Sequence, residues 1–369
     1  MNQLFRWDQM GLFLLALAAG ILPFAVPEVC AAALREGLTL CSGPLLLSLF
    51  PFLVVSRLLI QCPESDLLAL PFRLAAWGIG IRTPCAARVL CIGFLGGFAP
   101  AASAAAQAVR TGQLTAEEAD ALLPACICSG PSFVVLTVGQ SLLGSAELGV
   151  LLFTSQITAN YLTAALLNRF EGVHSVKPES AAPASPAPPR LDEILADAAI
   201  TYCKLCGFIL FFRMLAAGAG ALLPAGAGTL CSILLEVCSG CDLASRTGRW
   251  GSLLCCAALS VQGLSVLLQV RTICPPEMTL RPLYRSRLLH LPLSLALFYL
   301  LLPGGEADVF STLPARVLLM RRVPPDCALL VFAVCCMAAC TLRSGIRQVE
   351  QKQMARNAGG CCINSKTLL

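Results

Sequence analysis

Charged residues are scarce in this chain: Asp, Glu, Lys and Arg make up 13% of its 369 residues. A soluble globular domain carries roughly 25%. Half that charge cannot cover a water-exposed surface of this size. In addition, 57% of the residues are hydrophobic and the mean hydropathy is +0.78. The composition excludes a disordered chain, argues against a soluble enzyme and indicates a polytopic membrane protein.

Histidine and lysine are also rare, with 2 and 4 residues, and the net charge is only +5. This small, scattered excess argues against nucleic-acid binding. His174 and His290 are too isolated for a His-based metal or catalytic cluster. The GxxxxGK[ST], HExxH and GxSxG patterns are all missing. We therefore expect no enzyme activity, no cofactor and no metal ion.

Cysteine, in contrast, is abundant, with 21 residues. Most lie inside apolar runs, where Cys acts as a small hydrophobe in a reducing setting rather than as half of a disulfide. Two CxxC pairs, Cys203–Cys206 and Cys238–Cys241, lack histidine partners, which argues against zinc. The cysteines expected in apolar surroundings include Cys126, Cys128, Cys255, Cys256, Cys335 and Cys336.

Apolar windows free of Asp, Glu, Lys and Arg recur at about the length that a bilayer core requires, roughly 20 residues. They predict an all-α polytopic membrane protein with about 8–10 membrane segments, the first of them a retained helix rather than a cleaved signal. A further candidate at 198–212 is apolar except for Lys204. The windows fall at 9–27, 37–56, 89–109, 121–146, 148–168, 214–235, 250–270, 288–305 and 327–342.

A Pro-, Ala- and Ser-rich stretch at 171–193 predicts a flexible linker between two membrane halves, 1–170 and 194–305. A membrane segment at 306–342 and a basic tail at 343–369 follow. Each half has a similar order of apolar and Gly-broken segments, which favours two transporter-like halves. Positive loops stay in the cytoplasm, so we expect a cytoplasmic C-terminus from the cations Arg271, Arg281, Arg285, Arg287, Arg343, Arg347, Lys352, Arg356 and Lys366.

Several windows contain helix-breaking residues and predict broken or re-entrant helices. Breaks at membrane depth free backbone groups that protein or a wet cavity must satisfy, and paired breaks in two halves point to a transporter site. Tight packing, as in the small-residue seam Gly97–Ala101–Ala105, is the alternative. The break residues that we assign to a solute pathway are Gly96, Gly97, Pro100, Ser129, Gly130, Pro131 and Gly240.

Polar side chains inside apolar runs are further pathway candidates. Glu236 follows a charge-free window of 22 residues and precedes Gly240, so it either faces a cavity or marks a helix end. Lys204 can pair with Glu236 or extend to the membrane interface. Gln262 and Gln269 can contact a solute or join helices. Thr115 and Glu118 have the spacing of a helix capping box.

A set of short motifs occurs in a fixed order along these segments: Leu49–Val54, Gly96–Ala102, Leu114-Thr115, Glu117–Ala119, Leu122-Leu123, Ser129–Phe133, Gly139, Gly144-Ser145, Leu235–Val237, Gly240, Gln262–Val266 and Gln269-Val270. In this order they resemble a known family, the nucleoside-recognition (Gate) domain in its YlbJ-like sporulation form. The resemblance covers roughly residues 10–303, and its Gate-like motif spans about 90–147. It departs at Phe98-Ala99, where the family has Tyr-Pro.

This resemblance implies a cell-membrane protein of endospore formation, acting in cortex assembly, with a transporter-like fold. We expect it to move or gate a small polar solute through a midplane site. The alternative is a membrane scaffold that recruits cortex-building proteins without transport. The expected partners are the lipid bilayer, an unidentified small polar solute and other sporulation membrane proteins, with no nucleic acid.

Overall fold

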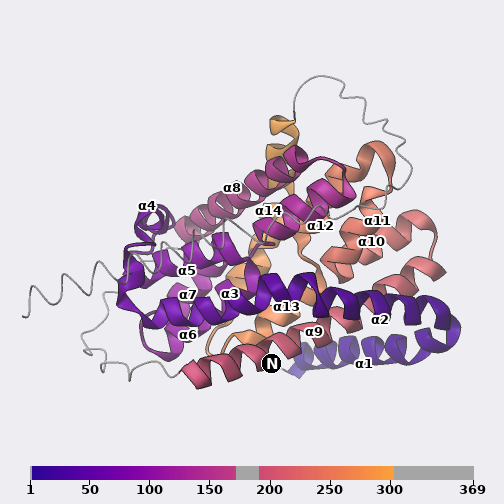
Figure 1. Cartoon of the computed structure of the whole chain (residues 1–369), viewed down its shortest axis with the longest axis horizontal. Helices are drawn as coiled ribbons and strands as arrows, with labels where there is room; N and C mark the ends of the chain where they lie inside the picture. The colour runs from indigo at the N-terminus through magenta and orange to yellow at the C-terminus, as the bar shows by residue number, and fades with distance from the viewer. Residues whose placement is uncertain (1, 172–190, 303–369) are drawn as a thin grey trace, which may run out of the picture.

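The computed structural model describes residues 2–171 and 191–302, and these residues form helices and connecting turns without any strand. The linker, the predicted 306–342 segment, the basic tail and Cys335–Cys336 lie wholly or mostly outside the described residues. Figure 1 shows α1, α2 and α9 running together along one side of the molecule, with α8 and α14 on the other side. The all-helical architecture expected from the sequence is confirmed for these two ranges.

Fourteen α-helices, one π-helix and two short 3-10 helices make up the described chain. The helix order is α1 (Asn2–Ala25), α2 (Pro27–Ser42), α3 (Pro44–Gln61), η1 (Pro63–Asp66), α4 (Leu70–Gly78), α5 (Pro84–Gly96), α6 (Phe98–Arg110), α7 (Ala116–Cys126), η2 (Ser132–Leu142), α8 (Ala146–Glu171), α9 (Leu191–Leu222), α10 (Ala225–Leu235), α11 (Val237–Ser245), η3 (Gly248–Trp250), α12 (Gly251–Val261), α13 (Gly263–Ile273) and α14 (Arg281–Leu301).

Four stretches are long and apolar enough to cross a membrane: Pro27–Leu47, Ala146–Glu171, Leu191–Leu222 and Gly248–Ile273. Shorter apolar helices account for several of the other windows. These features are consistent with a polytopic membrane protein, and the expected number of 8–10 segments stays a prediction.

The outer surface is apolar while the interior holds polar groups. Phe24 is 89% exposed and Leu288 is 78% exposed, whereas Gln156, Asn160 and His290 are buried. A protein in water avoids large exposed apolar patches. In a bilayer, lipid covers such a face, and polar side chains turn toward the bundle interior. This distribution fits the membrane location that the composition indicates.

The longest helix differs from the sequence expectation. The windows at 198–212 and 214–235 predict two segments, but α9 runs without a break from Leu191 to Leu222, and the next helix begins after Pro224. Arg213, which separates the two windows, lies inside α9 and forms an ion pair of 2.8 Å with Glu36 of α2. A paired charge can therefore lie within an apolar helix without ending it.

Two helical hairpins contain helices too short to cross a bilayer. α5 packs along α6, and α10 packs along α11, which lies beside it in Figure 1. The 13 residues of α5 extend for about 20 Å, against a hydrocarbon core of about 30 Å, and α10 and α11 are shorter still. Both pairs have the dimensions of re-entrant hairpins, with turns at Gly97 and Glu236.

Two further helices are interrupted. α7 ends at Cys126, and the π-helix η2 begins at Ser132 after the segment 127–131. α12 ends at Val261 and α13 begins at Gly263, with Gln262 in the left-handed conformation between them. The first break falls where Ser129, Gly130 and Pro131 predict it, whereas the 250–270 window gave no expectation of a second one.

Several local predictions are confirmed. Thr115 and Glu118 form the predicted capping box at the start of α7: each side chain accepts the backbone N–H of the other residue, at 3.1 Å in both directions. Cys126, Cys128, Cys255 and Cys256 are buried, as expected for small hydrophobes. The small-residue seam of Gly97, Ala101 and Ala105 is likewise buried, where α6 packs against α3, α5, α7 and α13.

Candidate functional site

The turn of the first hairpin lies directly against the break that follows α7. Gly97 has φ +81°, and a Cβ placed on it would stand 2.7 Å from the backbone nitrogen of Gly130. Only glycine fits here, because the left-handed conformation and the contact both exclude a side chain. Gly96 packs against Pro100 and Phe52 in the same turn. Gly97 and Gly130 therefore bring the α5–α6 turn and the α7–η2 break together.

The second hairpin turn meets the α12–α13 break in the same way. Gly263 has φ +71°, and a Cβ on it would stand 3.0 Å from the backbone nitrogen of Glu236. Gly240 lets α11 approach α10, because a Cβ there would stand 2.8 Å from the Cα of Ile233. Glu236 and Gly263 thus hold the second hairpin on the second break. Gly240, which the sequence assigned to a break, instead lies inside α11 and closes the hairpin.

Glu236 is buried, with 2% of its surface exposed, and its carboxylate caps α11. The carboxylate accepts the backbone N–H groups of Cys238 at 2.8 Å and Ser239 at 2.7 Å, together with the Ser239 hydroxyl at 2.8 Å. A carboxylate at a helix N-terminus also interacts favourably with the helix dipole. Of the two alternatives raised for Glu236, the structure shows the helix end: the residue caps the start of α11 and is buried there.

Gln262, in the α12–α13 break, contacts Ser129 in the α7–η2 break. Its side chain is 1% exposed, and its Nε2 donates to the carbonyl of Leu259 at 2.6 Å and, more distantly, to the hydroxyl of Ser129 at 3.5 Å. Its Oε1 is buried and has no partner among the described residues. We call this group the break cluster: Gly97, the segment 127–131, Glu236, Gln262 and Gly263.

Two residues outside the predicted set satisfy backbone groups of the break cluster. Asn160 of α8 donates to the carbonyl of Ile127 at 3.3 Å. Arg287 of α14 donates to Asn160 Oδ1 at 3.1 Å and, through a long contact of 3.5 Å, to the carbonyl of Ser260. Arg287 is 7% exposed and forms no ion pair with a carboxylate in the described chain. A buried guanidinium thus stands beside both breaks.

This finding corrects the assignment of Arg287 to a loop. Arg287 and His290 both lie inside α14 and are buried, because α14 begins at Arg281, before the apolar window. His290 Nε2 lies 3.2 Å from the carbonyl of Gln156 on α8. The sequence carried a signal for this contact: α8 has Gln156, Asn160 and Asn168 at four-residue multiples, and one helix face repeats with that spacing.

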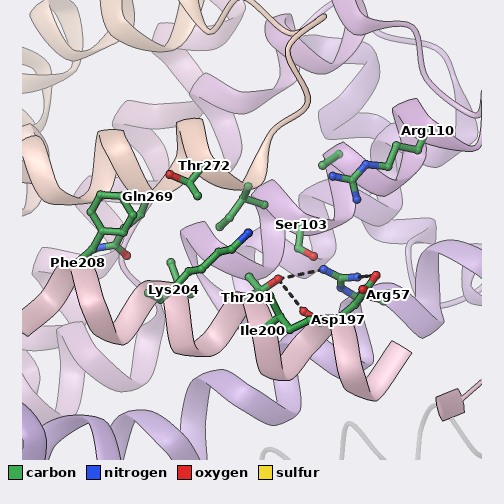
Figure 2. A pocket seen from close by; sticks show the side chains of 13 residues that line it. Arg57, Ser103, Arg110, Asp197, Ile200, Thr201, Lys204, Phe208, Gln269 and Thr272 are labelled. Carbon is green, nitrogen blue, oxygen red and sulfur yellow. Dashed lines mark hydrogen bonds and ion pairs between the residues drawn. The ribbon is translucent and has the colours of Figure 1, made fainter. Parts of the chain in front are cut away.

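A second feature is a cavity of about 150 Å³ between α3, α6, α9 and α13. Figure 2 shows Lys204 and Arg110 extending toward it from opposite sides, with Arg57 at its edge. Arg57 forms an ion pair of 2.6 Å with Asp197 and donates to Thr201 at 3.1 Å. The residues that we group as the cation-lined cavity are Arg57, Ser103, Arg110, Asp197, Lys204 and Gln269.

The predicted pathway residues therefore divide between two places. Gln269 and Lys204 line the cavity, and the pairing of Lys204 with Glu236 does not form: Lys204 is exposed, and the cation that interacts with Glu236 is Arg213. The remaining residues lie in or next to the break cluster: Gly96, Gly97, Pro100, Ser129, Gly130, Pro131, Glu236, Gly240 and Gln262.

The chemistry available at the break cluster is recognition by hydrogen bonding. It offers the Ser129 hydroxyl and the Gln262 amide, whose Oε1 has no partner in the described chain. The part of the chain that the structure describes contains no group of three or more His, Cys, Asp or Glu side chains that could hold a metal ion.

No family model matches the chain, and neither a curated protein nor a solved structure matches it. The resemblance to the nucleoside-recognition domain therefore stays a prediction, and function is inferred from the geometry of the break cluster and the cavity.

Proposed function

We propose that this chain is a membrane protein of spore formation that binds a small polar solute at the break cluster and moves or gates it across the membrane. The observation that carries the proposal is that four helix breaks lie together: Gly97 contacts Gly130, Gly263 contacts Glu236, and Gln262 lies 3.5 Å from Ser129. A helix break inside a bundle costs backbone hydrogen bonds, so four of them together favour a site over simple packing. The role in sporulation comes from the family resemblance alone.

The order of elements supports two transporter-like halves. The first half contributes a hairpin, α5–α6, followed by an interrupted helix, α7–η2; the second contributes α10–α11 followed by α12–α13. In each half, the hairpin turn lies against the interruption of the next helix, through Gly97 with Gly130 and through Gly263 with Glu236. Paired breaks at the interface of two repeats are the arrangement in which many transporters bind substrate.

The unpartnered oxygen of Gln262 supports a polar solute. A buried amide oxygen without a donor costs free energy, and a solute N–H or O–H group would remove that cost. The solute would exchange hydrogen bonds with the Gln262 amide and the Ser129 hydroxyl. The competing function, a scaffold without transport, requires only packing at these positions and places its important surface in the loops.

A substitution at Gln262 separates the two functions. In a sporulating strain that depends on this chain, Gln262→Gly keeps the left-handed backbone and removes the amide. We expect loss of heat-resistant spores at an unchanged protein level. Gln140→Ala is the matched control, because Gln140 is exposed on η2. Normal spores from Gln262→Gly, together with defects from Arg281→Gln or Arg285→Gln at the exposed start of α14, would favour the scaffold.

A further inference from the structure

We infer that the cation-lined cavity is a binding site for a dianionic phosphate group, either free phosphate or a phosphate monoester. The cavity is separate from the break cluster, so this inference goes beyond the proposed function. As a binding site, it depends only on the cavity itself.

The charge of the lining favours a dianion. Three cations, Arg57, Arg110 and Lys204, face one carboxylate, Asp197, which leaves a difference of two positive charges. A phosphate monoester carries about −1.5 to −2 at neutral pH, whereas a carboxylate carries a single charge. Asp197 is already paired with Arg57 at 2.6 Å. Lys204 and Arg110 form no ion pair within the described chain.

Two buried polar atoms in the lining lack partners. Ser103 Oγ and Gln269 Oε1 make no hydrogen bond in the described chain, and both residues are at least 97% buried. Figure 2 shows Ser103 and Gln269 among the side chains that surround the cavity. The Ser103 hydroxyl can donate to a phosphate oxygen, and Gln269 Oε1 can accept the remaining proton of the phosphate or a hydroxyl of an ester. Buried polar groups rarely stay unpaired, and a phosphate in the cavity would supply partners to both atoms.

The position of the cavity links it to the break cluster. Ser103 lies six residues after Gly97 on α6, and Gln269 lies seven residues after Gln262 on α13, so each is about 10 Å along its helix from a break. α6 and α13 pack against each other. α6 and α13 therefore each begin at a break, and each carries one of the unpartnered atoms of the cavity. A phosphate held there would stand one helical segment away from the proposed solute site.

The size of the cavity also fits a phosphate group. A volume of about 150 Å³ is well above the minimum that holds one water molecule, about 10–15 Å³. It accommodates a phosphate group with a short substituent. The same chemistry is presented by the headgroup of phosphatidic acid, so the experiment must separate a free phosphate from a lipid.

The experiment uses the full chain purified in detergent, with radiolabelled inorganic phosphate and glycerol phosphate as probes and acetate as the monoanion control. We expect saturable binding of phosphate, weakened by salt because the attraction is Coulombic. Lys204→Gln and Arg110→Gln should each lower affinity about tenfold, the equivalent of about 1.4 kcal/mol. Arg249→Gln is the matched control, since Arg249 is exposed and lies over Trp250 outside the cavity.

A second arm uses nanodiscs with and without phosphatidic acid. Binding of this lipid but not of free phosphate, lost in the same two variants, supports the site and assigns its ligand to the membrane. Absence of binding in both arms, or equal binding by Lys204→Gln, Arg110→Gln and Arg249→Gln, overturns the inference. If phosphate binds while Gln262→Gly sporulates normally, the proposed function fails and the site stands. If phosphate does not bind while Gln262→Gly fails to sporulate, the phosphate site fails and the proposed function stands.

Discussion

Gln262 and Ser129 lie 133 positions apart in the chain, yet the amide Nε2 of one reaches the hydroxyl of the other at 3.5 Å. Each residue sits in a helix break rather than on a helix face. The contact is long for a hydrogen bond, so it contributes little to stability. Its importance lies in position, because it marks the point where breaks from the two parts of the chain meet.

Substitution of Gln262 tests whether its amide or its backbone matters. Gln262 has φ +66°, which costs a residue with a side chain about 1 kcal/mol. Gln262→Gly should therefore melt at the same or a higher temperature, while spore formation is lost. Gln262→Asn tolerates the left-handed conformation but is shorter, so it should keep the fold and part of the function. A drop in melting temperature for Gln262→Gly would show that the side chain is structural.

Glu236 offers a second prediction, in which capping and charge are separated. Glu236→Gln loses part of the cap and should lower stability by about 1 kcal/mol. Glu236→Asp keeps the charge at a position where Asp is favoured. We expect spore cortex to form with the Asp variant and not with the Gln variant, compared at equal protein levels. Normal cortex from the Gln variant would end the idea that this carboxylate belongs to a solute pathway.

Gly97 and Gly112 form a matched pair for the close approach of the two breaks. Both have positive φ, at +81° and +68°, but a Cβ on Gly112 meets nothing within 4 Å, whereas one on Gly97 stands 2.7 Å from the backbone of Gly130. Gly112→Ala should cost only the conformational penalty, about 1 kcal/mol. Gly97→Ala should lower the free energy of unfolding several times more than Gly112→Ala does. It should also yield little monodisperse protein on size-exclusion chromatography. Similar behaviour of the two variants would contradict this close packing.

Glycine and proline made several breaks predictable. Gly97 and the Ser129–Pro131 stretch both interrupt helices where the sequence indicates. Gln262 was missed as a break, because only one glycine follows it and no proline is near. The position depends on the close approach of Gly263 to Glu236, a tertiary contact that local sequence does not encode.

Charged residues predicted the helix boundaries less well than glycine and proline did. Arg213 and Arg287 both look like helix boundaries in an apolar chain, but each lies inside a helix. Arg213 is stabilised by Glu36 from another helix, and Arg287 by oxygen atoms of Asn160 and Ser260. Partners this distant in sequence cannot be recognised from spacing along one segment. The cation-lined cavity was missed for the same reason, since its residues come from four helices.

The cytoplasmic C-terminus stays a prediction, with one correction to its basis. Arg287 is buried in α14 and no longer counts as a loop cation. Eight cations then remain on the predicted inner side, against Arg316, Arg321 and Arg322 on the other. The positive-inside rule still favours a cytoplasmic tail. A C-terminal reporter active only outside the cell membrane would contradict it.

The last prediction concerns Arg287, which has no carboxylate partner in the described chain and only one hydrogen bond shorter than 3.3 Å, to Asn160. Burying a charge costs several kcal/mol unless it is well paired, so these contacts do not offset its desolvation. Arg287→Met, which fills a similar space with an adaptable apolar chain, should therefore melt at or above the wild-type temperature.

Spore formation should nevertheless be lost in Arg287→Met, because the buried guanidinium beside both breaks would be gone. The matched control is Arg285→Gln, two residues away: Arg285 is exposed and pairs with Glu171 at 2.9 Å, and surface pairs contribute about 0–1 kcal/mol. It should leave melting temperature and spores nearly unchanged. A large fall in the melting temperature of Arg287→Met would instead mean that the guanidinium holds the breaks together, and that loss of function follows from loss of structure.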